Sequence, residues 1–443
     1  MNWGARLGEL IEAYGVPGAS LAVWHDGALT EHAAGVLNLA TGVEATPDSL
    51  FQIGSVTKLW TATQIMLLAE RGELALDTPV REPLPEFAVA DPEVTRSVTV
   101  RHLLTHTSGI DGDLFLDTGR GDDCLEKYVA ACADLVQLHP LGATQSYVNA
   151  GYPVLGRIIE RLTGRVWDAS LREMLVEPLG LAHTVTLPEE ALLHRAAVGH
   201  LGSGKDIRPT PVWGLMRPIG PAGLICASAA DVVRFGRAHL DASLLTDASR
   251  EAMATPQVEV PNKHALGEAW GLGWILDTWD GVRVLWHSGS TIGQQAALWV
   301  VPEMGLVAAL LTNGGHDGAL RADFSRELFA EVAGLAVRSV PEPSPGLAVD
   351  AARYTGLYER RHVRTTITEK DGGLSARVET TTLGLAELGP PLELDLLPVD
   401  ETTFVGVFGD DPDNPSKVPF VFYELPDGTP HVHFSARTNP RVS

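Results

Sequence analysis

Gly54-Ser55-Val56-Thr57-Lys58 leads into a long apolar segment, residues 59–74, and this junction decides the fold. The apolar residues of the segment recur at helical spacing, and Gly72 stands where the helix should end. Ser55 and Lys58 are three residues apart, so they share one face of the first turn, where hydroxyl and amine can meet. Because a helix N-terminus has unpaired N–H groups, it favours a deprotonated serine. The junction indicates a serine nucleophile with Lys58 as its base; the alternative is a surface serine beside an ordinary helical lysine.

The segments around this helix predict a sheet that is assembled from both ends of the chain. Its strands are expected at residues 18–24, 28–36, 282–287, 295–301 and 306–312, where small and apolar runs are separated by turns such as His25-Asp26-Gly27. Helices are expected at residues 1–15, 149–162, 229–239 and 321–332. The middle of the chain, residues 83–265, mixes helical segments with Pro/Gly loops. We therefore expect an α/β (α+β) fold with an antiparallel sheet, flanking helices and a helical subdomain.

A second domain is expected after a short linker. Residues 339–346 are rich in proline and have little to bury, which is typical of a linker. Beyond them, short alternating runs are separated by turns such as Asp371-Gly372 and Asp427-Gly428. The strands are expected at residues 354–358, 365–368, 374–379, 403–408, 418–425 and 431–436. This pattern predicts a small antiparallel β-barrel or sandwich. The expected boundaries are a catalytic domain at 1–338, the linker at 339–346 and the barrel at 347–443.

Two further stretches carry residue types that suit acyl-group chemistry. Tyr147 and Asn149 are two apart in an expected loop, so a phenol that exchanges protons and a carboxamide that holds a substrate dipole can point to the same side. His287-Ser288-Gly289-Ser290 follows an expected strand, where small residues let a substrate approach an exposed edge. The alternatives are a helix-capping loop for the first stretch and a strand-ending turn for the second.

The ordered set Ser55-x-x-Lys58, Tyr147-x-Asn149 and His287-x-Gly289 resembles the three active-site motifs of the serine β-lactamase and penicillin-binding-protein superfamily, in its class C branch. Supporting stretches at residues 101–109, 150–152, 221–224, 271–274 and 311–313 are similar to the same family, and the match spans about residues 5–335. The resemblance implies that Ser55 is the nucleophile and that Lys58 and Tyr147 transfer protons. Asn149, His287 and Gly289 would bind substrate, and the N–H groups of Ser55 and Ser290 would form the oxyanion hole.

One departure from the family pattern concerns the substrate. Histidine stands at position 287, where β-lactamases and cell-wall peptidases usually carry a lysine whose charge meets the substrate carboxylate; histidine is largely neutral at pH 7. We therefore expect β-lactamase activity that is weak at most. Relatives with histidine at this position resemble esterases, D-amino-acid peptidases or amidases, and transacylases. The tail contains Tyr354-x-Gly356-x-Tyr358 and the terminal run Arg437-Thr438-Asn439-Pro440-Arg441. With these stretches it resembles the lipocalin-like domain of some aminopeptidase-like hydrolases and of penicillin-binding-protein-type thioesterases, which release and cyclise peptidyl chains.

Composition limits the partners and the location. Lys plus Arg number 33 against 56 Asp plus Glu, so the net charge of −23 disfavours nucleic acid and anionic membrane. The start of the chain does not resemble a secretory signal, so a cytoplasmic protein is expected. The three cysteines, Cys124, Cys132 and Cys226, read as packing residues. Residues 111–123 hold five aspartates and read as a solvated loop, with attraction of an amine-bearing substrate as the alternative.

These observations predict serine acyl transfer through an acyl-Ser55 intermediate, with no metal or cofactor. The donor would be a small-molecule or peptidyl ester, thioester or peptide, delivered in some cases by a carrier protein, and the acceptor would be water or an amine, with peptide cyclisation as one outcome. The alternatives are a plain carboxylesterase or D-amino-acid amidase, a catalytically silent ligand-binding module, and a metallo-hydrolase using His102, His106 or His431. The oligomeric state is left open.

Overall fold

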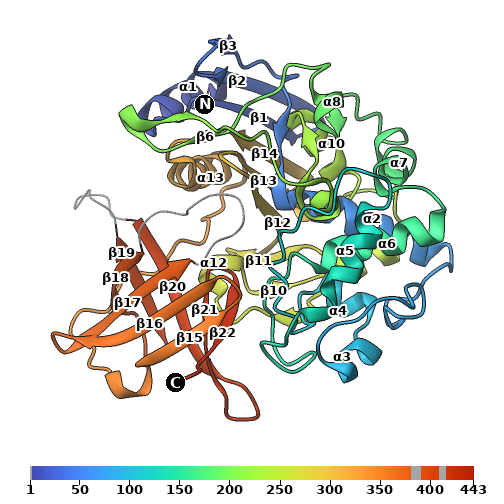
Figure 1. Ribbon diagram of the computed structural model, residues 1–443. Helices are drawn as coiled ribbons and strands as arrows, with labels where there is room; N and C mark the ends of the chain where they lie inside the picture. Colours follow the sequence, from blue (N-terminus) through green and yellow to red (C-terminus); the bar gives the residue numbers. More distant parts are fainter. Residues whose placement is uncertain (1, 381–390, 409–415) are drawn as a thin grey trace.

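One antiparallel sheet joins strands from early and late in the chain, in a computed structural model that describes residues 2–380, 391–408 and 416–443 (Figure 1). In sheet order the described strands are β3 (Val43–Glu44), β2 (Ala28–Asn38), β1 (Gly18–His25), β14 (Leu306–Thr312), β13 (Gln295–Val301), β12 (Val282–Ser290), β11 (Ile275–Trp279), β10 (Ala269–Trp270) and β9 (Val258–Glu259). The N-terminal hairpin pairs with the late strands through β1 and β14, from Ala19 opposite Thr312 to Trp24 opposite Val307. The sheet expected from both ends of the chain is confirmed.

Both faces of this sheet are covered, because its central strands are apolar on both sides. Along β14, Val307, Ala309 and Leu311 join the core on the side of α2 (Thr57–Glu70) and α10 (Ala229–Arg237). Leu306, Ala308 and Leu310 join the core on the opposite side. There they pack with α1 (Trp3–Ala13) and α13 (Asp317–Ala333). Successive side chains of β14 point to opposite faces of the sheet, so the strand contributes to both cores.

The helical part lies beside the sheet, on the right in Figure 1. It includes α3 (Pro92–Ser97), α4 (Val100–Leu104), α5 (Cys124–Ala131), α6 (Gly151–Thr163), α7 (Trp167–Leu171), α8 (Pro188–Ala191), α9 (Gly220–Gly223) and α11 (Asp247–Ala254). The short helix α12 (Lys263–Leu266) lies apart from these, next to the C-terminal domain. All three cysteines are buried and unpaired, as expected for packing residues. Helix α13 (Asp317–Ala333) begins four residues before the expected start at residue 321. The sequence pattern missed this first turn because Leu320 is its one large apolar residue. None of the helices in the described part combines the length and apolar character of a membrane span.

The tail forms a nearly closed antiparallel barrel, drawn in orange to red in Figure 1. Its described strands are β15 (Gly356–Arg360), β16 (Val363–Lys370), β17 (Gly373–Thr380), β18 (Leu392–Pro398), β19 (Thr403–Phe408), β20 (Ser416–Glu424), β21 (Pro430–Phe434) and β22 (Arg437–Pro440). The two outer strands approach each other through a bridge between Tyr358 and Arg441. Residues 339–346 lie between α13 and the barrel and contain no helix or strand. The domain boundaries themselves stay a prediction.

Candidate active site

Ser55 and Lys58 lie where β4 (Phe51–Gln52) passes through a tight turn, η1 (Gly54–Val56), into α2. The strand is held by pairing with β8 (Cys226–Ala227). Gly54 has a φ of +51°, and a Cβ atom there would lie 2.5 Å from the backbone nitrogen of Ser290. Because no larger residue fits, glycine is required at this turn. The turn places the Ser55 hydroxyl 3.1 Å from Nζ of Lys58.

Lys58 is completely buried, which is uncommon for a lysine. Its amine also donates to Oδ1 of Asn149 at 3.0 Å and to the carbonyl oxygen of Ala222 at 2.8 Å. Burial lowers the pKa of Lys58 well below its ordinary value; the charge of Arg437 lowers it further, and Asp113 opposes both. The neutral amine is therefore favoured at a pH where an exposed lysine is charged.

Tyr147 lies beside this pair, as the sequence predicts. Nζ of Lys58 is 5.0 Å from the centroid of its ring, and His106 stacks on the ring at 4.3 Å. His106 also fixes the loop, because its Nδ1 accepts a hydrogen bond from the backbone N–H of Val148 at 3.0 Å. The Tyr147 hydroxyl makes no hydrogen bond of ordinary geometry to the described residues. Burial raises the pKa of Tyr147, and the nearby Ser55 side chain opposes the rise.

Asn149 joins the pair from the same loop and is largely buried, with 8% of its surface exposed. Its Oδ1 faces Lys58, and its Nδ2 donates to Oδ1 of Asp113 at 2.8 Å. Asp113 in turn is ion-paired with Arg360 and Arg437, both from the barrel. The expected solvated loop at 111–123 is therefore wrong for Asp111 and Asp113, which are buried against the barrel.

The third stretch belongs to β12 rather than to a turn after it, which corrects the expected strand end at residue 287. Pairing with β13 continues to Ser290, opposite Gln295, whereas pairing with β11 ends at Trp286. Residues 287–290 are therefore unpaired on one side within the described chain. A Cβ atom on Gly289 would lie 2.0 Å from the carbonyl oxygen of Ile53 and 2.7 Å from the backbone nitrogen of Ser55. This close contact fixes β12 against the turn that carries Ser55.

His287 is buried and neutral. Its Nδ1 contacts the carbonyl oxygen of Ser288 at 2.6 Å, so Nδ1 carries the proton and Nε2 keeps a free electron pair. Nε2 has no hydrogen-bond partner among the described residues. Burial, aided by Lys58, lowers the pKa of His287 to about 3. The neutral character expected from the sequence thus fits the structure, and the ring lies 6.3 Å from that of Tyr147.

The structure brings together all seven residues predicted for the site, and it adds residues that the sequence reasoning missed. The turn between β21 and β22 reaches the loop of Tyr147, whose backbone N–H donates to the carbonyl oxygen of Ala436 at 3.1 Å. The guanidinium of Arg437 lies 5.1 Å from the centroid of the Tyr147 ring. The only sequence signal was the terminal run beginning at Arg437, which resembles a family feature. The chemical roles of the predicted residues stay predictions.

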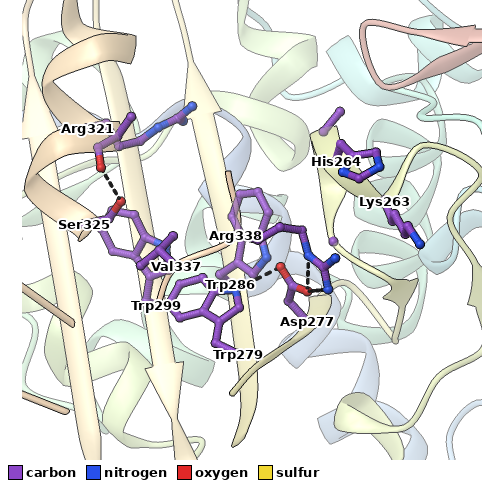
Figure 2. Close-up of a pocket in the computed structure, with 13 residues that line it drawn as sticks. Lys263, His264, Asp277, Trp279, Trp286, Trp299, Arg321, Ser325, Val337 and Arg338 are labelled. Atoms are coloured by element: carbon purple, nitrogen blue, oxygen red, sulfur yellow. Dashed lines mark hydrogen bonds and ion pairs between the residues drawn. The ribbon is translucent and has the colours of Figure 1, made fainter. Parts of the chain in front are cut away.

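A cavity of about 170 Å³ lies elsewhere, between β11–β13, α13 and the chain that follows it (Figure 2). Trp279, Trp286 and Trp299 line it, and Figure 2 shows the carboxylate of Asp277 held by Arg338. It contains none of the residues predicted for chemistry. In the described part of the chain, no group of three or more His, Cys, Asp or Glu side chains is arranged to hold a metal ion.

Comparisons with known proteins show the family of the chain. Residues 5–331 match the family model described as Beta-lactamase. The chain is 49% identical over 373 residues to Penicillin-binding protein 4 of Amycolatopsis lactamdurans, covering 81% of this chain and 97% of that one. It is 28% identical over 347 residues to Esterase EstB of Burkholderia gladioli, covering 68% and 87%. The crystal structure of SurE is similar with a TM-score of 0.78 at 27% identity, covering 99% of this chain and 98% of that one. The chain therefore belongs to the β-lactamase and penicillin-binding-protein family of serine hydrolases.

Proposed function

We propose that this protein is a serine acyl-transfer enzyme that works through an ester of Ser55. The observation that carries the proposal is the completely buried amine of Lys58, 3.1 Å from the Ser55 hydroxyl. A neutral amine has two N–H groups and one electron pair. Two of its three contacts, Oδ1 of Asn149 and the carbonyl oxygen of Ala222, can only accept. The electron pair is therefore left for Ser55, which suits a general base.

The reaction then proceeds in two steps. Lys58 takes the proton of Ser55, and Oγ forms a bond to the carbonyl carbon of the donor. The N–H groups of Ser55 and Ser290 stabilise the oxyanion. Tyr147 passes a proton to the leaving oxygen, sulfur or nitrogen as its bond to the carbonyl carbon breaks. Water or an amine then gives its proton to the Tyr147 phenolate and attacks the carbonyl carbon of the acyl-Ser55 ester. Lys58 returns its proton to Oγ of Ser55 as the bond between Oγ and that carbon breaks, which releases a carboxylic acid or an amide and restores all three side chains.

The donor we propose is an ester, thioester or peptide, free or delivered by a carrier protein. The neutral His287 does not provide the charge that would bind a β-lactam carboxylate, and the nearby cation, Arg437, is already paired with Asp113. The barrel contacts on the Tyr147 loop lie beside the candidate site, which supports a role for this domain in selecting the acyl group or the acceptor. Plain ester hydrolysis is the second candidate, and the similarity to Esterase EstB supports it.

Intact mass spectrometry tests the proposal. The protein is exposed to a p-nitrophenyl ester, a peptidyl thioester, a D-amino-acid amide and a β-lactam, with Ser55→Ala as the control. We expect a mass increase equal to the acyl group with the ester or thioester, no increase in Ser55→Ala, and little with the β-lactam. Acyl mass on Ser55→Ala would overturn the assignment of the nucleophile. A chain that gains no mass from any donor would instead be a ligand-binding module.

A further inference from the structure

The side-chain amide of Asn149 can be placed in two orientations of the same shape, and only its hydrogen-bond partners decide between them. An ionised carboxylate accepts hydrogen bonds and donates none, so Asp113 can face only Nδ2 of Asn149. The contact of 2.8 Å between Nδ2 and Asp113 therefore leaves Oδ1 toward Lys58. We propose that Asp113 is a positioning residue whose carboxylate, held by two barrel arginines, orients Asn149 so that the electron pair of Lys58 faces Ser55. This inference rests on the proposed function.

The reversed amide shows why the orientation matters. With Nδ2 toward Lys58, the amide would donate a hydrogen bond to the amine and occupy its electron pair. Ser55 would then face an N–H group of Lys58 instead of a base. The carboxylate of Asp113 excludes this arrangement, because it would meet the amide oxygen of Asn149 as a second acceptor. A residue that does not touch the substrate thus determines whether Lys58 can accept a proton.

The carboxylate of Asp113 is held by ion pairs with two arginines of the barrel rather than by residues of its own loop. Its Oδ2 lies 2.6 Å from Nε of Arg437 and 3.1 Å from Nη1 of Arg360, and Oδ1 accepts from Nη2 of Arg437 at 2.9 Å. Only 9% of the Asp113 side chain is exposed. Burial alone would raise its pKa, but the two arginines outweigh burial and hold the pKa below its ordinary value. The barrel thereby keeps the carboxylate ionised.

Asp113 and Arg437 also act on Lys58 in opposite directions. The Asp113 charge raises the pKa of Lys58, and the Arg437 charge lowers it, although burial is the largest cause of the low value. The titratable and charged groups that face Lys58 come from several elements: Ser55, His106, Asp113, Tyr147, Tyr152, His287 and Arg437. Burial keeps both histidines neutral. Asp113 and Arg437 are therefore the charges through which the pKa of Lys58 can be moved.

The test is the pH dependence of kcat/KM for p-nitrophenyl acetate in the full chain. Activity should fall at low pH as Lys58 becomes protonated, and the midpoint of that fall belongs to the coupled Ser55–Lys58–Tyr147 unit. Asp113→Asn should move the midpoint to lower pH, and Arg437→Gln should move it to higher pH, each by about half a pH unit or more. Two shifts in the same direction, or none, would overturn the proposal.

A second comparison isolates the amide orientation. Asparagine at 113 still offers an oxygen to Nδ2 of Asn149, so Asp113→Asn should keep kcat within about tenfold of the wild type. Asp113→Ala removes this oxygen and should lower kcat by about 10- to 100-fold, with a smaller change in KM. If the alanine variant does not fold, the opposite pH shifts still decide.

The matched control is Asp111→Asn. Asp111 accepts a hydrogen bond from the backbone N–H of Arg361 at 2.5 Å, so this variant weakens barrel docking without touching Asn149. We expect its pH midpoint to stay at the wild-type position. A shift as large as that of Asp113→Asn would overturn the proposal in favour of a purely structural role for the loop. A wild-type chain that is never acylated would instead overturn the proposed function, which separates the two failures.

Discussion

Lys58 owes its proposed reactivity to its surroundings. Its two carbonyl contacts leave one electron pair for Ser55 when the amine is neutral, and burial, which lowers the pKa of Lys58, favours that neutral form. Tyr147 shares the same enclosed space, and no described residue makes a hydrogen bond of ordinary geometry to its hydroxyl. Under the proposed function the two side chains serve one proton path, so their contributions to the rate should be interdependent.

Removal of either group should slow acylation strongly. We expect Lys58→Ala and Tyr147→Phe each to lower kcat by about 10²- to 10⁴-fold, because general acid–base groups contribute on that scale. The double variant should be little slower than the worse single variant. Single-turnover acylation by an activated ester measures the rates, and the unfolding midpoint of each variant shows that the fold is retained. Losses that multiply in the double variant would show that the two groups act separately.

At this scale the sequence could predict only the residues whose geometry is local. Ser55 and Lys58 meet because they are three apart on one helix, and Tyr147 and Asn149 share one loop. The ion pair between Asp113 and Arg437 joins positions 324 residues apart in the chain. No periodicity or spacing connects such distant residues, so the sequence predicted a solvated loop or an amine-attracting one, and neither interpretation included the barrel.

At the scale of the element, β12 ends later than its sequence predicts. Its apolar alternation stops at Trp286, and the polar residues that follow suggest the end of a strand. Pairing with β13 carries the strand on to Ser290, because the partner strand still offers backbone groups opposite each of these residues. Neighbouring strands, rather than local propensity, thus set the end of β12.

Gly289→Ala tests the contact between β12 and the Ser55 turn. The added methyl group would overlap the carbonyl oxygen of Ile53, at 2.0 Å, and the nitrogen of Ser55, at 2.7 Å. We expect acyl-enzyme formation to fall by about 10²-fold or more, since displaced backbone N–H groups no longer match the oxyanion. The control is Gly373→Ala in β17, where the nearest atom is an ordinary 3.6 Å away. Equal losses in both variants would show that the effect is not specific to the turn.

At the scale of the whole molecule, the barrel contributes contacts to the candidate active site. The strand pattern predicted a barrel, but β18 and β22 escaped notice because prolines border one and polar residues fill the other. Its docking could not be predicted, since it depends on backbone and charge contacts such as Ala436 with Tyr147 and Arg437 with Asp113. The barrel and the loop that carries Tyr147 should consequently unfold in the same transition.

Buried histidines should make the whole molecule sensitive to mild acid. His239, His287, His431 and His433 are each at most 5% exposed. Burial is the largest cause of their low pKa values, about 3 for His239, His287 and His433 and about 4 for His431. In the unfolded chain these histidines bind protons near pH 6.5, so between about pH 6.5 and 4 the unfolded state holds more protons than the folded state. The free energy of unfolding must therefore fall as the pH falls through this range.

Each such histidine contributes a slope of up to about 1.4 kcal/mol per pH unit. Asp317, whose pKa burial raises to about 6, acts in the opposite direction and offsets about one histidine. Urea unfolding at several pH values measures the slope. His433→Gln, at the contact with Gln145 of the catalytic loop, should reduce it by about 1.4 kcal/mol per pH unit. The same substitution at the exposed His316 is the matched control. An equal reduction there would show that the slope does not come from the buried ring of His433. A stability that rises toward pH 4 would also contradict the prediction, because the folded chain would then bind more protons than the unfolded chain.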